Sequence, residues 1–199
     1  MGFLKKLFGS TTDSSSEVVK NHLPEIDLET LPTDELFMHH FKKNGGKFLY
    51  CENLNETREQ FENILEENDW FECEALCFEP KLYSLLEENK LNFEDVKNPK
   101  FIFASCENLI ADEGAILFSS NQIRQYKPNE LPTNIVILAT TSQISLSKGD
   151  SLQKIRKKYT SDYPTNITAI KYFDQSIEQD FLSYGSVPKN LYLLLLEDL

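Results

Sequence analysis

One short block of the sequence combines residue types that could bind a small anion and act on it. Asp112, Glu113 and Gly114 stand directly before a run of apolar residues, and Arg124 follows that run. An arginine can hold a carboxylate or a phosphate through two parallel hydrogen bonds, and a nearby carboxyl group can act as an acid or a base. Glycine lets a backbone approach a ligand closely. We interpret these four residues as a candidate ligand-binding site, although an internal salt bridge from Arg124 to Asp112 or Glu113 explains the pattern equally well.

The other residues that could carry chemistry favour structural roles. Cys73 and Cys77 have the spacing of half a metal knuckle, but a second pair is missing, and Cys51 and Cys106 stand apart. The pattern therefore predicts reduced, buried thiols. The three histidines all precede residue 41, and the sequence contains neither a glycine-rich phosphate loop nor a nucleophile elbow. We expect no bound metal and no cofactor.

Charge and composition exclude several classes of partner. The 199 residues include 20 Lys and Arg against 32 Asp and Glu, which gives a net charge of -12. Such a surface repels phosphate backbones and anionic lipid headgroups. No apolar run approaches the roughly 18 residues of a membrane span, and no secretory signal precedes the domain. We expect a cytoplasmic protein that binds no nucleic acid and has no membrane span.

Helices and strands alternate along the chain and would position the candidate site. Helices are predicted at 33–43 with Thr33 as its cap, at about 54–68, after Pro80, at 148–159 and at 175–182. Strands are predicted at 47–51, 74–78, 101–104, 115–118, 135–139, 167–170 and 191–196. The continuous apolar runs at 115–118 and 135–139 are typical of parallel strands buried on both faces. This order predicts a three-layer α/β/α fold with a mainly parallel, Rossmann-like sheet.

The first part of the chain differs in composition from the rest. The apolar residues between Phe3 and Phe8 would share one face of a short helix beside two lysines, and a polar, serine-rich stretch follows at 10–16. A helix this short is marginal in water. We expect a flexible tail over residues 1–22, with a membrane-surface or partner-docking anchor as the sharper alternative, and a single α/β domain over residues 23–199.

The order of features over residues 33–199 resembles the LUD-domain family, which is associated with lactate utilisation. In that family a middle block has the form A-E-T-G-T and is followed by a strand, an arginine, and L-P before the next strand. Here residues 111–115 read A-D-E-G-A, Arg124 follows, and residues 131–132 read L-P. The resemblance implies a fold similar to the group of CoA transferases, ribose-phosphate isomerases and glucosamine-phosphate deaminases.

The same resemblance implies a role in lactate or related organic-acid utilisation, as a cluster-free subunit or accessory protein. Glu113 and Ala115 replace both threonines of the middle block, and two later family blocks are largely changed at 170–178 and 184–188. The implied ligand site is therefore degenerate. Two alternatives stay open. One is a non-catalytic binding or assembly module that works with other lactate-utilisation proteins or as a homo-oligomer. The other is an enzyme acting on a small anionic or phosphorylated metabolite.

Overall fold

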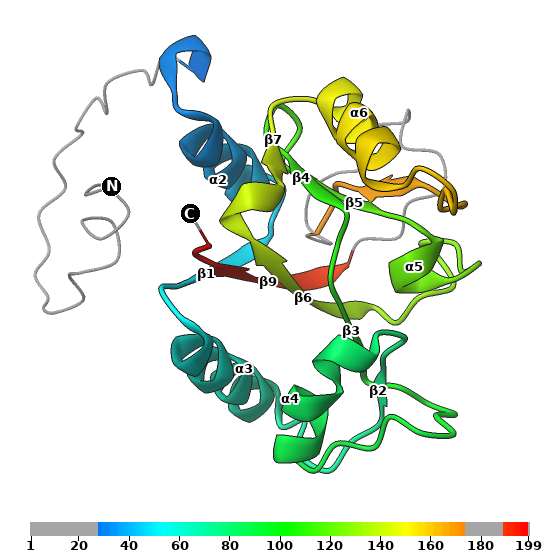
Figure 1. Ribbon diagram of the computed structural model, residues 1–199. Helices are drawn as coiled ribbons and strands as arrows, with labels where there is room; N and C mark the ends of the chain where they lie inside the picture. The colour runs from blue at the N-terminus through cyan, green and yellow to red at the C-terminus, as the bar shows by residue number, and fades with distance from the viewer. Residues whose placement is uncertain (1–27, 174–188, 199) are drawn as a thin grey trace, which may run out of the picture.

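The computed structural model describes residues 28–173 and 189–198 of the chain (Figure 1). The helix predicted at 175–182, the changed family block at 184–188 and the expected tail lie outside the described residues. The described helices are α2 (Thr33–Lys43), α3 (Leu54–Asn68), α4 (Tyr83–Glu88), α5 (Ser120–Ile123) and α6 (Lys148–Lys158), with 3-10 turns η1 (Leu28–Thr30), η2 (Pro80–Leu82) and η3 (Thr141–Gln143). None of these helices is both long enough and apolar enough to cross a membrane.

A five-stranded sheet forms the centre of the fold. Its strands, in spatial order, are β1 (Lys47–Cys51), β9 (Asn190–Leu196), β6 (Asn134–Thr140), β3 (Phe101–Ala104) and β2 (Ala75–Leu76). Every pairing within this sheet is parallel. The prediction of an α/β fold with a mainly parallel central sheet flanked by helices is therefore confirmed.

A second, four-stranded sheet was not predicted. It consists, in spatial order, of β7 (Ile144–Ser145), β4 (Asn108–Ile110), β5 (Ala115–Phe118) and β8 (Thr168–Ile170). Strand β5 runs antiparallel to both of its neighbours, so the prediction that residues 115–118 form a parallel strand is wrong. One face of β5 packs into the main core and the other packs toward Ile155 of α6. Burial on both faces produces the same continuous apolar run whatever the strand direction.

Two apolar cores lie on opposite faces of the central sheet. Figure 1 shows α3 and α4 on one side of that sheet, and α2, the second sheet and α6 on the other. Because successive side chains of a strand point to opposite faces, Phe101 and Phe103 of β3 join the core beneath α3 and α4, while Ile102 and Ala104 join the core beneath α2. Trp70 stacks on Phe101 with ring centroids 4.9 Å apart. These two cores fix the sheet that carries the site.

Caps hold the helix starts that border the carboxyl edge of the sheet. The side chain of Asn53 accepts backbone hydrogen bonds from the first turn of α3. Ser147 and Asp150 form a reciprocal capping box at the start of α6. The predicted cap of α2 is wrong, because Thr33 is the first helical residue and Pro32 occupies the cap position without a side-chain hydrogen bond. The starts of α3 and α6 are thus fixed beside the edge where open α/β sheets bind ligands.

Candidate functional site at the carboxyl edge of the sheet

Described residues line a larger and a smaller cavity at the carboxyl edge of the parallel sheet. The larger, which we call the cleft, has a volume of about 1350 Å³ and lies beyond the ends of β1 and β9, between α2 and α6. The smaller, which we call the hollow, has a volume of about 350 Å³ and lies beyond the ends of β2 and β3. Both positions agree with the rule that open α/β sheets bind ligands at this edge.

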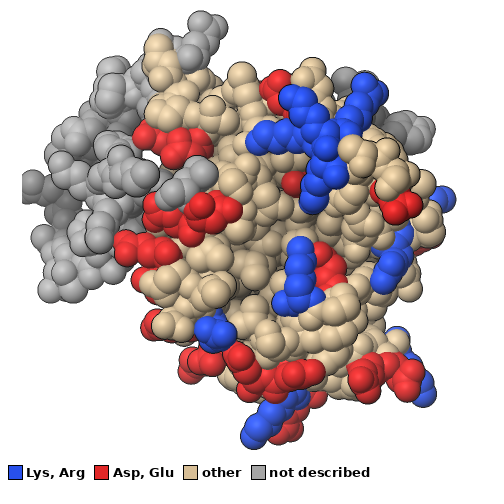
Figure 2. Space-filling model, viewed as in Figure 1, with Lys and Arg blue, Asp and Glu red and all other residues tan. Residues whose placement is uncertain are grey.

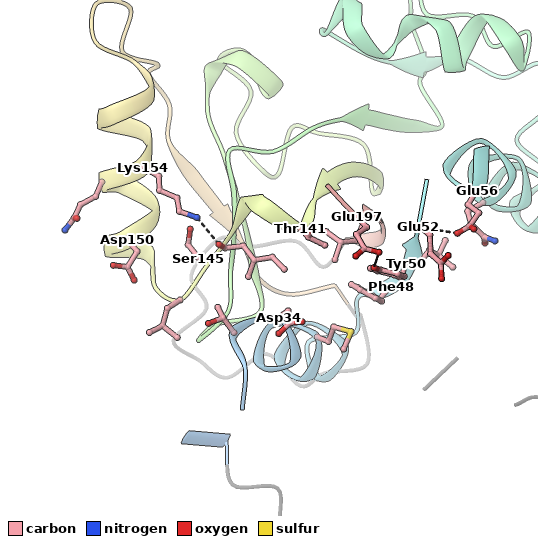
Figure 3. A pocket seen from close by; sticks show the side chains of 18 of the residues that line it. Asp34, Phe48, Tyr50, Glu52, Glu56, Thr141, Ser145, Asp150, Lys154 and Glu197 are labelled. Atoms are coloured by element: carbon pink, nitrogen blue, oxygen red, sulfur yellow. Dashed lines mark hydrogen bonds between the residues drawn. The ribbon is translucent and has the colours of Figure 1, made fainter. Parts of the chain in front are cut away.

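The cleft has an apolar floor and a charged rim (Figure 3). Apolar side chains from α2, β1, β7 and β9 form the floor: Met38, Phe48, Ile144 and Leu195. Five carboxylates also line the cleft: Asp34, Glu52, Glu56, Asp150 and Glu197. Among the described residues, only two lysines do so, Lys154 and Lys157 of α6. This excess of negative charge repels a small anion, so the cleft does not suit an organic acid.

Hydrogen bonds fix two carboxylates at the end of β9. The Tyr50 hydroxyl donates to the Glu197 carboxylate, and burial together with that bond raises the pKa of Tyr50 well above its usual range. Asp198 accepts from Thr141 Oγ1 at 2.8 Å and from Ser142 Oγ at 2.6 Å. Although burial acts in the opposite direction, the hydrogen bonds from Ser142 and Thr141 lower the pKa of Asp198 to about 2. The end of β9 is therefore tied to η3 and to β1.

A buried carboxylate and an exposed lysine form one side of the hollow. Glu79 follows β2, and its side chain is only 10% exposed. It accepts hydrogen bonds from the backbone N–H and the hydroxyl of Ser105, both at 2.6 Å. Lys81 Nζ lies 3.1 Å from the Glu79 carboxylate and donates to Ser105 Oγ at 2.9 Å, while its side chain is 64% exposed. The negative group is thus held inside and the ammonium faces solvent.

A second pair of the same kind closes the other side of the hollow. The side chain of Glu107 is fully buried and accepts from Ser119 Oγ at 2.7 Å, from Gln122 Nε2 at 3.1 Å and from the Tyr159 hydroxyl at 3.1 Å. Lys158 Nζ donates to Glu107 at 3.1 Å, and its side chain is 57% exposed. Burial alone would raise the pKa of Glu107, but the bonds from Ser119, Gln122 and Lys158 outweigh it and lower that pKa.

In each pair the ammonium is the exposed member, so positive groups face solvent at the hollow although each is paired with a buried carboxylate. An ammonium group has three N–H donors, so Lys81 and Lys158 can each add a contact to the bonds they already make. Figure 2 shows Lys and Arg side chains gathered over α6, which carries Lys158. Cys106 also lines the hollow, but its thiol is buried, and burial raises its pKa far above the usual range. The thiol therefore stays protonated and is a poor nucleophile.

The structure brings three of the four sequence-predicted site residues together. Asp112, Glu113 and Gly114 form the turn between β4 and β5. Gly114 has a φ of +60°, and a Cβ atom there would lie 2.4 Å from the backbone of His40 in α2. The Glu113 carboxylate lies 3.8 Å from the ammonium of Lys171. Glycine is thus needed at this turn because the turn packs directly against α2.

Arg124, the fourth predicted residue, lies at the opposite end of β5. Its carbonyl accepts from Asn166 Nδ2 at 3.0 Å, before β8, whereas Lys171 beside Glu113 follows β8. The guanidinium lies 5.6 Å from the Phe78 ring centroid and 3.5 Å from the Phe78 carbonyl oxygen. Among the described residues no ion pair joins Arg124 to Asp112 or Glu113. A ligand-binding role for each of these four residues stays a prediction.

Sequence reasoning missed the residues of the hollow. Glu107 carried a detectable signal, because it is the only charged residue in the mostly apolar stretch between Phe101 and Ala111. Lys158 belongs to the basic run at 154–158, whose composition is also typical of the polar face of a surface helix. Glu79 and Lys81 flank Pro80, and that proline was interpreted as the start of a helix. An isolated carboxylate within an apolar run is the signal that points to a buried charge and its partner.

Comparison with known proteins gives one informative similarity. The structure is similar to the crystal structure of a DUF162 family protein from Deinococcus radiodurans, with a TM-score of 0.56 over 84% of this chain and 99% of that chain. The two sequences are 10% identical, so the similarity shows the fold alone. No family model matches the sequence, and neither does any curated protein. DUF162 is the family to which the LUD resemblance points, and the shared fold agrees with that resemblance.

Proposed function

We propose that this chain is a cytoplasmic LUD-type protein that binds a small organic acid in the hollow. It would serve lactate or related organic-acid utilisation as a cluster-free accessory protein. The observation that carries the proposal is the pair of exposed ammonium groups, Lys81 and Lys158, that line one small cavity at the carboxyl edge of the sheet. The LUD resemblance supports the biological process, and the fold shared with a DUF162 protein agrees with that resemblance.

The size and the donors of the hollow suit a small carboxylate. Its volume of about 350 Å³ lies at the lower end of the roughly 300–1,000 Å³ typical of ligand pockets. Amide side chains of Asn121, Gln122 and Gln143 and the Tyr159 hydroxyl line it beside the two lysines. Two ammonium groups can neutralise a carboxylate, while hydroxyl and amide groups can bond the neighbouring hydroxyl or carbonyl oxygen of a 2-hydroxy or 2-oxo acid.

The proposal is binding rather than catalysis. Glu107 has a lowered pKa and is ionised at neutral pH, so it can accept a hydrogen bond but cannot supply a proton. Its oxygens are already bonded to five side chains. The Cys106 thiol is protonated and buried. The groups around the hollow are therefore arranged to hold a ligand.

The test is thermal unfolding of the full chain with L-lactate, pyruvate, other small organic acids and inorganic phosphate. A ligand present at 100 times its dissociation constant should add about 2.7 kcal/mol to the free energy of unfolding. For a chain of this size the midpoint should rise by about 5–10 °C. Binding constants from calorimetry should then fall on addition of salt, because two exposed lysines supply much of the attraction.

Three variants decide where the ligand binds. Lys81→Gln and Lys158→Gln should each abolish the ligand-induced shift, whereas the matched control Lys157→Gln on the same helix, which lines the cleft, should leave it unchanged. Circular dichroism confirms that each variant is folded. A shift that survives both hollow variants, or a panel in which no acid raises the midpoint, would overturn the proposal.

A further inference from the structure

The cleft has the dimensions and the surface of a groove for a short chain segment. Its volume of about 1350 Å³ exceeds the roughly 300–1,000 Å³ of typical small-molecule pockets. Phe48 and Met38 on its floor are each 7% exposed, and Leu146 at its edge is 53% exposed. An apolar floor of this kind receives the apolar side chains of a bound segment, which anchor it as in helix-in-groove recognition.

The charges around the floor specify a basic occupant. Figure 3 shows Tyr50, Glu52, Glu56 and Glu197 on one side of the cleft and α6 on the other. Five carboxylates and two lysines line the cleft in all. Lys154 is held against the wall, since its ammonium donates to the Ile144 carbonyl at 2.9 Å. The carboxylates outnumber the lysines, so electrostatic complementarity favours positive charges on the segment that fills the cleft.

The chain itself contains a segment of that composition. Residues 3–8 read F-L-K-K-L-F, with four apolar side chains and two lysines. The described chain begins at Leu28 and enters α2, whose Thr33 and Asp34 line the cleft. Residues 9–27 connect the segment to this point, and an extended chain of that length reaches on the order of 60 Å. The segment is therefore long enough and close enough in the chain to reach the cleft.

We propose that the cleft binds residues 3–8 of the same chain. The apolar side chains Phe3, Leu4, Leu7 and Phe8 contact the floor, and Lys5 and Lys6 face the carboxylates of the rim. Intramolecular attachment raises the effective concentration of the segment to the millimolar range, so a modest intrinsic affinity is enough for occupancy. The cleft, unlike the hollow, is then a docking site within the chain, and its occupancy does not depend on the organic-acid proposal.

Zero-length carbodiimide crosslinking of the full chain tests this inference. The reagent joins an amine to a carboxylate only where the two are in contact. Mass spectrometry should find crosslinks from Lys5 or Lys6 to the cleft carboxylates Asp34, Glu52, Glu56, Asp150 or Glu197. The pair Lys47–Glu67, whose nitrogen and oxygen lie 3.2 Å apart, is the internal positive control. A mixture of isotopically light and heavy protein separates crosslinks within one chain from those between chains.

Three outcomes would overturn the proposal. The first is a sample in which Lys47 and Glu67 are joined but Lys5 and Lys6 reach none of the cleft carboxylates. The second is a set of mixed light–heavy crosslinks, which would assign the segment to the cleft of a second copy. The double variant Lys5→Glu with Lys6→Glu should increase hydrogen exchange in α2 and β1. The matched control Lys20→Glu should not. Unchanged exchange in both would also refute the docking.

Discussion

The strongest single prediction concerns the buried Glu107 carboxylate. Replacing Glu107 with Gln keeps the size of the side chain but removes its charge, and its amide NH₂ replaces one of the two oxygens, to which either Gln122 or Lys158 now donates. Breaking a buried charge pair by changing one partner typically costs about 3–5 kcal/mol. Lys158 is 57% exposed and its ammonium can be hydrated instead, so we reduce this to about 2–3 kcal/mol.

The assay uses the only tryptophan of the chain. Trp70 is 7% exposed and stacks on Phe101, so its fluorescence reports global unfolding in denaturant. At neutral pH, Glu107→Gln should lower the thermal midpoint by about 4–12 °C. The exposed Glu62→Gln on α3 is the matched control and should stay within about 0.5 kcal/mol of the wild type.

The pH dependence of the Glu107→Gln effect tests its electrostatic origin. The folded-state pKa of Glu107 lies below the ordinary value of 4.5, so the unfolded chain binds more protons as the pH falls. The stabilisation by the carboxylate is complete above about pH 4.5 and is lost as the pH falls through the folded pKa. The stability gap between wild type and variant should therefore shrink in acid. A gap under about 0.5 kcal/mol at pH 7, or one that persists unchanged to pH 3, would refute the reasoning.

Three further predictions concern the turn, the sheet edge and the thiols. Gly114→Ala should destabilise the folded protein strongly and lower expression, because its Cβ would meet the backbone of α2 at 2.4 Å. Gly149→Ala in α6 should instead raise the free energy of unfolding by about 0.4–1 kcal/mol, measured by denaturant unfolding. Nuclear magnetic resonance titration should place the Asp198 carboxyl near a pKa of about 2, and a value near 4 would contradict the three-donor contact with η3. A colorimetric thiol reagent should modify Cys73 first, because the other three thiols are buried, and fast modification of several thiols would contradict that burial.

The central sheet was predictable because its strands are both apolar and bounded by clear breakers. The helix at 54–68 was equally clear, since Asn53 caps it and an apolar stripe follows. The second sheet was not predictable for a physical reason. Its strands have two to four residues, and a run such as Ala115–Phe118 reports burial on two faces without reporting the direction of its neighbours.

The candidate site was only partly predictable. Asp112, Glu113 and Gly114 lie in one turn, as neighbours in the chain directly before β5. Whether Arg124 joins them depends on the pairing of β5 with β8. The two ends of β8 contact opposite ends of β5, and the two strands are far apart in the sequence. The hollow likewise joins Lys81 to Lys158 through the order of strands in the sheet. Long-range pairing of this kind leaves no trace in a local pattern.

The place of β9 has a consequence for how the protein is made. This strand lies between β1 and β6, yet it is the last of the described strands in the chain. Until residues 190–196 leave the ribosome, β1 and β6 have no partner between them, and each presents an open edge of unpaired backbone groups. The central sheet can therefore complete its strand pairing only after β9 has been synthesised. During synthesis the nascent chain should be a client of chaperones that shield exposed strand edges, and ribosome stalling before residue 190 should yield an aggregation-prone product.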